Sequence, residues 1–191
     1  MSSYISIILG SIFINNYVLA QFLGICPTLG VSKKLDTSVG MGLAVTFVIT
    51  LSSVITLLLN NYILVPFGLQ YLKTIAFILV IASLVQFVEM FLKKTSPSLY
   101  NALGVFLPLI TTNCVVLGVA ILNVDSGYNI LETVANSISA SVGFTIALVL
   151  LSAIREKYEV LDVPKSFRGV PIALISLGLM SIAFFGFRGL I

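Results

Sequence analysis

Two long stretches of the chain carry no charge: residues 1–32 and 95–124 contain no Lys, Arg, Asp or Glu. A helix needs about 20 mostly apolar residues to span a bilayer, so each stretch is longer than one crossing requires. In the whole chain 59% of the residues are hydrophobic and 9% are charged, whereas about a quarter are charged in soluble domains. So little polar surface cannot cover a globule in water, and we expect a membrane protein.

Apolar segments separated by polar, glycine- and proline-containing breaks predict six membrane-spanning helices. They are placed at residues 4–23, 39–59, 71–92, 99–122, 130–154 and 170–187. The fold class is therefore expected to be all-α and polytopic, with one membrane domain over residues 1–191. No Lys or Arg precedes Lys33 and no small-residue cleavage site follows a short apolar run, so no removable signal peptide is expected.

The basic residues are distributed unevenly between the two sides of such a bundle. The loops after the first, third and fifth spans hold eight of the ten Lys and Arg residues, and the other side holds only Lys73 and Arg188. Short cytoplasmic loops are enriched in Lys and Arg, so the eight-residue side is predicted to be cytoplasmic and both termini to lie outside. This placement in loops points to membrane topology rather than to nucleic-acid binding.

The first and fourth spans contain residues that break helices. Glycine or proline occurs at Gly24, Pro27, Gly30, Gly104, Pro108 and Gly118. Proline removes a backbone hydrogen bond and bends a helix, and broken backbone survives at membrane depth only where protein buries it. Spans 1 and 4 are therefore predicted to be discontinuous helices at the centre of the protein. The alternative is a pair of long, tilted, proline-kinked helices.

One short motif occurs in each half of the chain. Cys26-Pro-Thr-Leu-Gly-Val matches Cys114-Val-Val-Leu-Gly-Val, and later spans match more weakly. Three spans per half is an odd number, so the halves, residues 1–93 and 94–191, must enter the membrane in opposite directions. This predicts two inverted three-helix repeats, in which sites lie near the midplane where broken helices meet.

Cys26 and Cys114 are the only cysteines, and the chain has no histidine. The two thiols could be small buried hydrophobic groups, a disulfide, thiolate ligands of a metal or a redox-active dithiol. Inverted symmetry brings equivalent positions to one axis, and Pro27 suits the first turn of a half-helix whose dipole favours a thiolate. These points favour metal ligation. Because an iron–sulfur cluster typically takes four cysteines, another chain is expected to supply the rest.

Uncharged polar residues and glycines flank the two cysteines. They are Asn15, Asn16, Gly30, Thr111, Thr112, Asn113 and Gly118. The amides and hydroxyls could hydrogen-bond cluster sulfurs, stabilise broken helix ends or contact a passing sodium ion, and the glycines let backbones approach closely. Ordinary interhelical hydrogen bonding is the simpler role for most of them. Ionisable residues are nearly absent from the spans, so a carboxylate proton relay is unsupported.

At these residues the sequence resembles the A-type subunits of the Rnf complexes, the ion-translocating ferredoxin:NAD oxidoreductases. The resemblance covers essentially the whole chain and is carried by residues 15–27, 30–34, 104–114 and 167–174, among them Asn-Asn-Tyr-Val-Leu-Ala-Gln-Phe-Leu-Gly-Ile-Cys-Pro. A sister family, the E-type subunits of the sodium-pumping NADH:quinone reductases, shares the cysteine positions. Outside these families, a small inverted-repeat secondary transporter and an assembly scaffold are the alternatives.

The resemblance implies a component of a multisubunit translocase with no activity alone, in the bacterial cytoplasmic membrane. It implies that this chain and a homologous, oppositely inserted partner, the E-type Rnf subunit, each supply two cysteines to one [2Fe–2S] cluster. Cys26 and Cys114 are the matching positions. It further implies that the B-, C-, D- and G-type Rnf subunits carry the other iron–sulfur clusters and the flavins, and that electron transfer is coupled to Na⁺ or H⁺ translocation.

Overall fold

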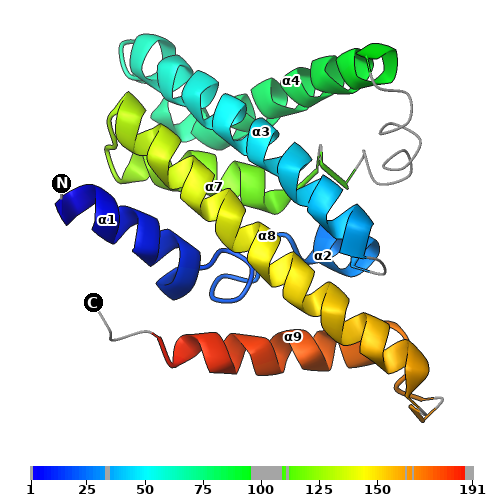
Figure 1. Ribbon diagram of the computed structural model, residues 1–191. Helices are drawn as coiled ribbons and strands as arrows, with labels where there is room; N and C mark the ends of the chain where they lie inside the picture. Colours follow the sequence, from blue (N-terminus) through cyan, green and yellow to red (C-terminus); the bar gives the residue numbers. More distant parts are fainter. Residues whose placement is uncertain are drawn as a thin grey trace.

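The computed structural model describes residues 2–32, 35–95, 109–110, 112–161, 163–164 and 166–187. Within these ranges the chain is helical and contains no strand, which confirms the all-α fold class (Figure 1). The elements are α1 (Ser2–Leu9), the π-helix η1 (Gly10–Ile14), α2 (Ile25–Val31), α3 (Leu35–Leu59), the π-helix η2 (Asn60–Leu64), the 3₁₀-helix η3 (Gln70–Leu72), α4 (Lys73–Thr95), α7 (Cys114–Asp125), α8 (Ile130–Val160) and α9 (Val170–Phe185).

Three helical stretches of the described chain are long and apolar enough to cross a bilayer. They are Leu35–Leu64, Gln70–Met90 and Ile130–Tyr158, at the second, third and fifth predicted spans. The helices α7 and α9 are apolar but shorter, with 12 and 16 residues. At 1.5 Å per residue, α7 covers about 18 Å of a hydrocarbon core about 30 Å thick, so α7 alone crosses only part of it.

The first predicted span is interrupted, as expected, but of its three predicted breakers only Gly24 lies in the break, while Pro27 and Gly30 lie within α2. The helix formed by α1 and η1 ends at Ile14, the next ten positions contain turns but no helix, and α2 begins at Ile25. Phe22 and Gly24 in this break have positive φ angles of 55° and 80°. The alternative of one continuous kinked helix is therefore wrong for this span.

The fourth predicted span is described only in part. Residues 109–110 are helical, residues 112–113 are not, and α7 begins at Cys114. Most of the span before this point, with Gly104 and Pro108, lies outside the described residues, as does Thr111.

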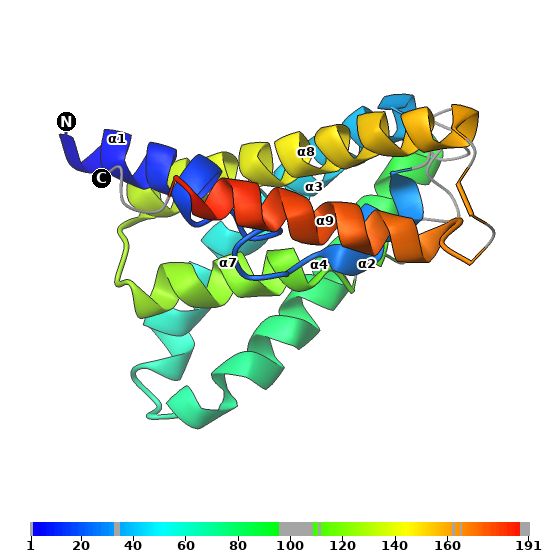
Figure 2. The same ribbon diagram turned by 90° about the horizontal axis from the view of Figure 1, so that it is seen from below.

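The centre of the bundle is the crossing of α3 and α8, which lie side by side in both views (Figures 1 and 2). A Cβ added to Gly42 on α3 would lie 2.6 Å from Thr145 Oγ1 on α8, so the glycine permits this close approach. Around this pair, α7 packs on α3, while α1 and η1 pack on α8. The flanking helices are α4, which contacts α3 and α7, and α9, which contacts α8 and η1.

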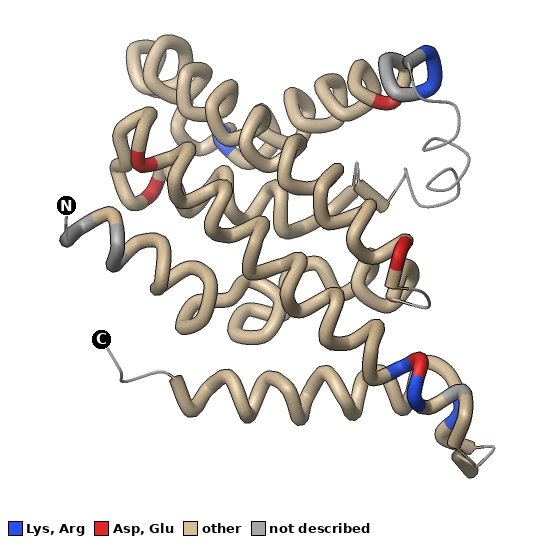
Figure 3. The backbone as a smooth tube through the Cα atoms, viewed as in Figure 1, with Lys and Arg blue, Asp and Glu red and all other residues tan. Residues whose placement is uncertain are grey.

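Charged residues gather at the two ends of the bundle (Figure 3). The last turns of α4 and α8 carry Lys93, Lys94 and Lys157, and these turns lie at the same end. At the opposite end, where α1 begins, Asp125 of α7 forms an ion pair with Lys73 at the start of α4. Four further basic residues, Lys33, Lys34, Lys165 and Arg188, lie outside the described residues.

Candidate functional site

Cys26 lies in the first turn of α2, as Pro27 indicated. Gly24, in the left-handed conformation (φ 80°, ψ 22°), precedes the helix, and Pro27 is buried in its first turn. Proline is tolerated there because a first-turn N–H has no partner within the helix. The Cys26 side chain is exposed, although free cysteine is among the most buried residue types. The interpretation as a small buried hydrophobic group is therefore wrong for Cys26.

Cys114 is the first residue of α7. Its predecessor Asn113 is the N-cap, with Oδ1 accepting a hydrogen bond from the Val115 N–H at 3.1 Å. Cys114 is partly exposed, and neither cysteine forms a disulfide. Both cysteines thus stand in the first turn of a helix, Cys26 in α2 and Cys114 in α7.

The two cysteine motifs meet in space. The Gly24 N–H, two residues before Cys26, donates a hydrogen bond to Cys114 Sγ with an N···S distance of 2.8 Å. A Cβ on Gly24 would lie 2.5 Å from Val115 Cγ2, and one on Gly118 would lie 2.6 Å from Leu23 Cδ1. Glycine at these positions is therefore what lets the break in the first span lie against the first turns of α7.

Asn16, predicted as a neighbour of the site, stabilises the break. Its Nδ2 donates to the carbonyl oxygens of Gly143, at 2.9 Å, and Ile12, at 3.1 Å. Its Oδ1 accepts from the backbone N–H groups of Val18, at 3.0 Å, and Leu19, at 3.3 Å. All four contacts are to backbone, so the amide has no donor left for a sulfur.

Asn113 differs from Asn16 because its buried Nδ2 has no hydrogen-bond partner. The Val115 N–H donates to Oδ1, which identifies the other end of the amide as its NH₂ group. The unpaired group is therefore a donor, and it lies next to Cys114. A buried unpaired polar group costs about 1–3 kcal/mol and calls for a partner. Of the other predicted neighbours, Asn15 and Thr112 are exposed and Gly30 is half-buried.

A row of buried polar side chains, missed by the sequence reasoning, joins η1, α7 and α8. Ser11 Oγ donates to Asn136 Oδ1, Asn136 Nδ2 donates to Asn123 Oδ1 at 2.6 Å, and Asn123 Nδ2 donates to Ser137 Oγ at 3.2 Å. All four residues are buried. The available signal was one asparagine at the end of the charge-free stretch 95–124 and one inside the fifth predicted span, where interhelical hydrogen bonds are expected. The row ties the first half of the chain to the second.

The described residues do not complete a metal site by themselves. No group of three or more His, Cys, Asp or Glu side chains is gathered among them. The groups that the fold brings together here are the Cys114 sulfur, the Gly24 N–H that donates to it and the unpaired Asn113 amide next in sequence, and Cys26 follows two residues after Gly24.

Comparison with known proteins identifies relatives over the full length. The family described as "Rnf-Nqr subunit, membrane protein" matches residues 4–191. The chain is 58% identical to the A-type subunit of the ion-translocating oxidoreductase complex of Serratia proteamaculans and 56% identical to that of Yersinia enterocolitica, over 100% of this chain and 99% of each relative. These names agree with the resemblance seen in the sequence. On this full-length similarity, the chain belongs to the Rnf-Nqr family of membrane subunits.

Proposed function

We propose that this chain is the A-type membrane subunit of an ion-translocating ferredoxin:NAD oxidoreductase of the Rnf type. In this proposal Cys26 and Cys114 are two of the four ligands of a [2Fe–2S] cluster, and the homologous E-type Rnf subunit provides the other two. When bound, such a cluster takes up and releases one electron at a time. The observation that carries the proposal is the Gly24 N–H to Cys114 Sγ hydrogen bond, which joins the two motifs.

Three features of the residues support thiolate ligation. Each cysteine lies at the start of a helix, where the dipole stabilises a negative sulfur. The Gly24 N–H donates to Cys114 Sγ, and a hydrogen bond to the charged form of a group favours that form. The unpaired Asn113 Nδ2 is a further hydrogen-bond donor next to Cys114. The exposure of Cys26 leaves its thiol accessible to a second chain.

Packing supports the inverted repeats over residues 1–93 and 94–191. If α3 and α8 are equivalent, their crossing lies on the symmetry axis, and the packing of α7 on α3 corresponds to that of α1 and η1 on α8. Likewise α4 on α3 corresponds to α9 on α8. Thr46 Oγ1 donates to Gly42 O at 2.7 Å, and its predicted equivalent Thr145 Oγ1 donates to Ser141 O at 2.8 Å.

The proposal includes six crossings of the bacterial cytoplasmic membrane, with both termini outside. The basic ends of α4 and α8 then face the cytoplasm, as short basic loops favour. The B-, C-, D- and G-type Rnf subunits would complete the complex, and electron transfer would drive Na⁺ or H⁺ across the bilayer. A solute transporter has no need for paired thiols, and the names of the relatives favour an A-type Rnf subunit over the E-type subunit of a quinone reductase.

The test is made on the complete purified complex carrying Cys26→Ala or Cys114→Ala. Iron content, flavin content and the electron paramagnetic resonance spectrum are measured after reduction. Each variant is expected to lose one and the same [2Fe–2S] signal and the iron of one cluster while retaining the flavins. Ser83→Ala is the control, because Ser83 is exposed on α4 and its hydroxyl bonds only the Val80 carbonyl of its own helix.

An unchanged spectrum together with unchanged ferredoxin-to-NAD activity would overturn the proposal. If the chain were only an assembly scaffold, the cysteine variants would give a third pattern. The subunits would dissociate, while every cluster signal would persist in the separated parts. Subunit stoichiometry measured on the same samples separates that outcome from loss of the cluster.

A further inference from the structure

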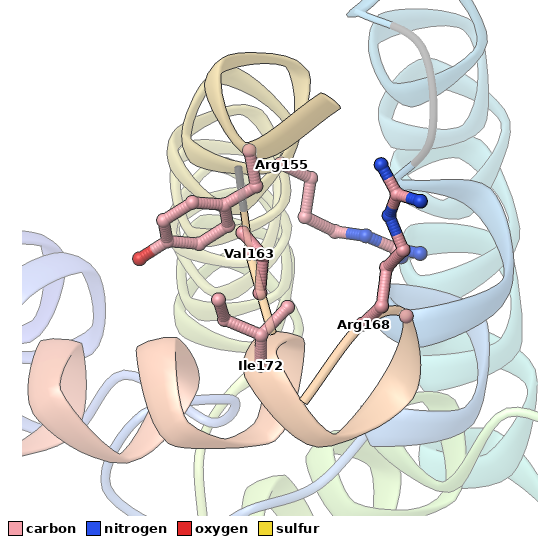
Figure 4. Close-up of a pocket in the computed structure, with 6 residues that line it drawn as sticks. Arg155, Val163, Arg168 and Ile172 are labelled. Carbon is pink, nitrogen blue, oxygen red and sulfur yellow. The ribbon is translucent and has the colours of Figure 1, made fainter. Parts of the chain in front are cut away.

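A pocket at the basic end of the bundle lies between the end of α8 and the start of α9 (Figure 4). Its cavity is about 150 Å³, enough for several water-sized groups. The lining residues are Arg155, Tyr158, Val163, Arg168, Gly169 and Ile172. The pocket is distinct from the cysteine site and is not used by the proposed function.

Two guanidinium groups give the pocket a positive charge. Arg155 and Arg168 lie on the same side of it in Figure 4, and none of the described residues that line it is acidic. Arg155 is held in place because one of its nitrogens donates to Leu29 O and to Ser32 Oγ, both at 2.7 Å. Like charges repel at short range, so an anion beside both groups would lower their energy.

The start of α9 lies at the same pocket. Gly169, with φ of 97°, precedes this 16-residue helix and lines the cavity together with Ile172. The dipole of the helix places a partial positive charge at its start, which favours an anion. The first turn offers few free donors, because Pro171 has no N–H and the Ile172 N–H donates to Phe167 O at 3.1 Å. Tyr158 also lines the pocket. Its hydroxyl lies 3.2 Å from Ser176 Oγ, whose own proton donates to Ile172 O at 2.8 Å, so the phenol is held by Ser176.

Apolar surface surrounds this polar centre. Val163 and Ile172 form part of the wall. Next to it, the exposed fractions of Val160, Phe167 and Val170 are 90%, 50% and 55%. Exposed apolar residues beside arginines at the end of a membrane helix match the headgroup region of a bilayer, where basic pockets between helices bind anionic lipids.

We propose that this pocket binds the phosphate of an anionic phospholipid. The two arginines bind the phosphate oxygens, the dipole of α9 favours the negative charge, and the apolar residues contact the glycerol and the first methylenes of the acyl chains. A free phosphate ion would use the polar half of the site only. An acidic side chain of a neighbouring subunit would use the arginines without any requirement for lipid.

The test uses the complete complex, stripped of lipid in detergent and then supplied with phosphatidylglycerol, phosphatidylcholine or inorganic phosphate. Bound lipid is counted by native mass spectrometry, and the melting temperature is recorded. Arg168→Gln is the main variant, because Arg168 is exposed, whereas Arg155 also binds α2. Lys94→Gln is the matched control, since it removes one positive charge from an exposed residue at the same end of the bundle.

Wild type and Lys94→Gln are expected to bind phosphatidylglycerol and to gain stability from it, with little effect of phosphatidylcholine. Arg168→Gln is expected to bind about tenfold more weakly, the loss that follows from removing a charge-assisted hydrogen bond. Arg168→Lys keeps the charge without the planar fork and should fall between the two. It serves as the test variant if Arg168→Gln lowers the yield of assembled complex.

Equal phosphatidylglycerol binding by wild type and Arg168→Gln would overturn the proposal. So would full stabilisation by inorganic phosphate alone, which would identify an anion site without lipid recognition. Cross-linking of position 168 to an acidic residue of another subunit, with no bound lipid, would also overturn it in favour of a protein contact. Cluster signals are unaffected in all of these outcomes, so failure here is distinct from failure of the proposed function.

Discussion

At the scale of single residues, Asn15 and Asn16 show how neighbours of the same type take different roles. Asn16 is buried and bonds four backbone groups, whereas the Asn15 side chain is exposed. Both were predicted neighbours of the cysteines, and the sequence alone does not distinguish them. The difference arises because the turn after η1 directs one amide towards the backbone of α8 at Gly143.

Replacing Asn16 with alanine is expected to destabilise the first half of the chain. It leaves the N–H groups of Val18 and Leu19 buried without an acceptor, and each unpaired group costs about 1–3 kcal/mol. We expect a total loss of about 2–4 kcal/mol, measured as a lower melting temperature of the purified complex. Asn15→Ala is the control and should melt like the wild type. Equal melting temperatures of the two variants would contradict this role of Asn16.

At the scale of elements, the sequence predicted that the first span is broken, but it placed two of the three breakers, Pro27 and Gly30, in what is the helix α2. It did not predict how the break is used. The hydrogen bond from Gly24 to Cys114 and the unpaired Asn113 amide depend on contacts between segments far apart in the chain. The duplicated motif indicated that the cysteines share a site, but only the fold specifies that the backbone before one donates to the sulfur of the other.

Gly24→Ala tests this junction between the break and α7. A side chain at φ of 80° costs about 1–2 kcal/mol, and the new Cβ would lie 2.5 Å from Val115 Cγ2, which adds about 1–3 kcal/mol of overpacking. The N–H of residue 24 would also move relative to Cys114. We therefore expect a lower melting temperature and a shifted reduction potential of the cluster signal that depends on Cys114.

Gly68→Ala is the matched control for Gly24→Ala. Gly68 has a similar φ of 65°, but nothing lies within 4 Å of its added Cβ. The Gly68→Ala variant should have the same kind of backbone strain as Gly24→Ala without the clash of the new Cβ, and it should leave the reduction potential of the cluster unchanged. If the reduction potential also stays unchanged in Gly24→Ala, the hydrogen bond from Gly24 to Cys114 does not influence the potential of the cluster.

At the scale of the whole molecule, hydropathy and charge predict which segments are helical and which loops share a side. They do not predict the packing order, in which α3 and α8 cross at the centre with α4 and α9 at the flanks. That order depends on small residues such as Gly42, opposite Thr145, and on the buried row that includes Asn123 and Asn136. Such contacts are long-range pairings of common residues, which leave no periodic signal in the sequence.

The orientation in the membrane is the remaining whole-molecule prediction. Exposed Ser126 follows α7 at the end that carries the Lys73–Asp125 ion pair, and exposed Ser166 lies in the basic loop before α9. Because eight of ten Lys and Arg residues belong to loops on the side of Ser166, that side should be cytoplasmic. Ser126→Cys should thus react with a membrane-impermeant maleimide in intact spheroplasts, and Ser166→Cys only after the membrane is opened.

The wild-type complex, labelled in parallel, gives the background from Cys26 and Cys114. Reaction of Ser166→Cys in intact spheroplasts, with Ser126→Cys protected, would reverse the assignment of both termini. Reaction of both from outside would mean that α8 and the segment up to Ser166 do not cross, although Ile130–Tyr158 is long and apolar enough. The double comparison therefore tests the side of each loop and the crossing between them, on which the inverted arrangement of the two halves depends.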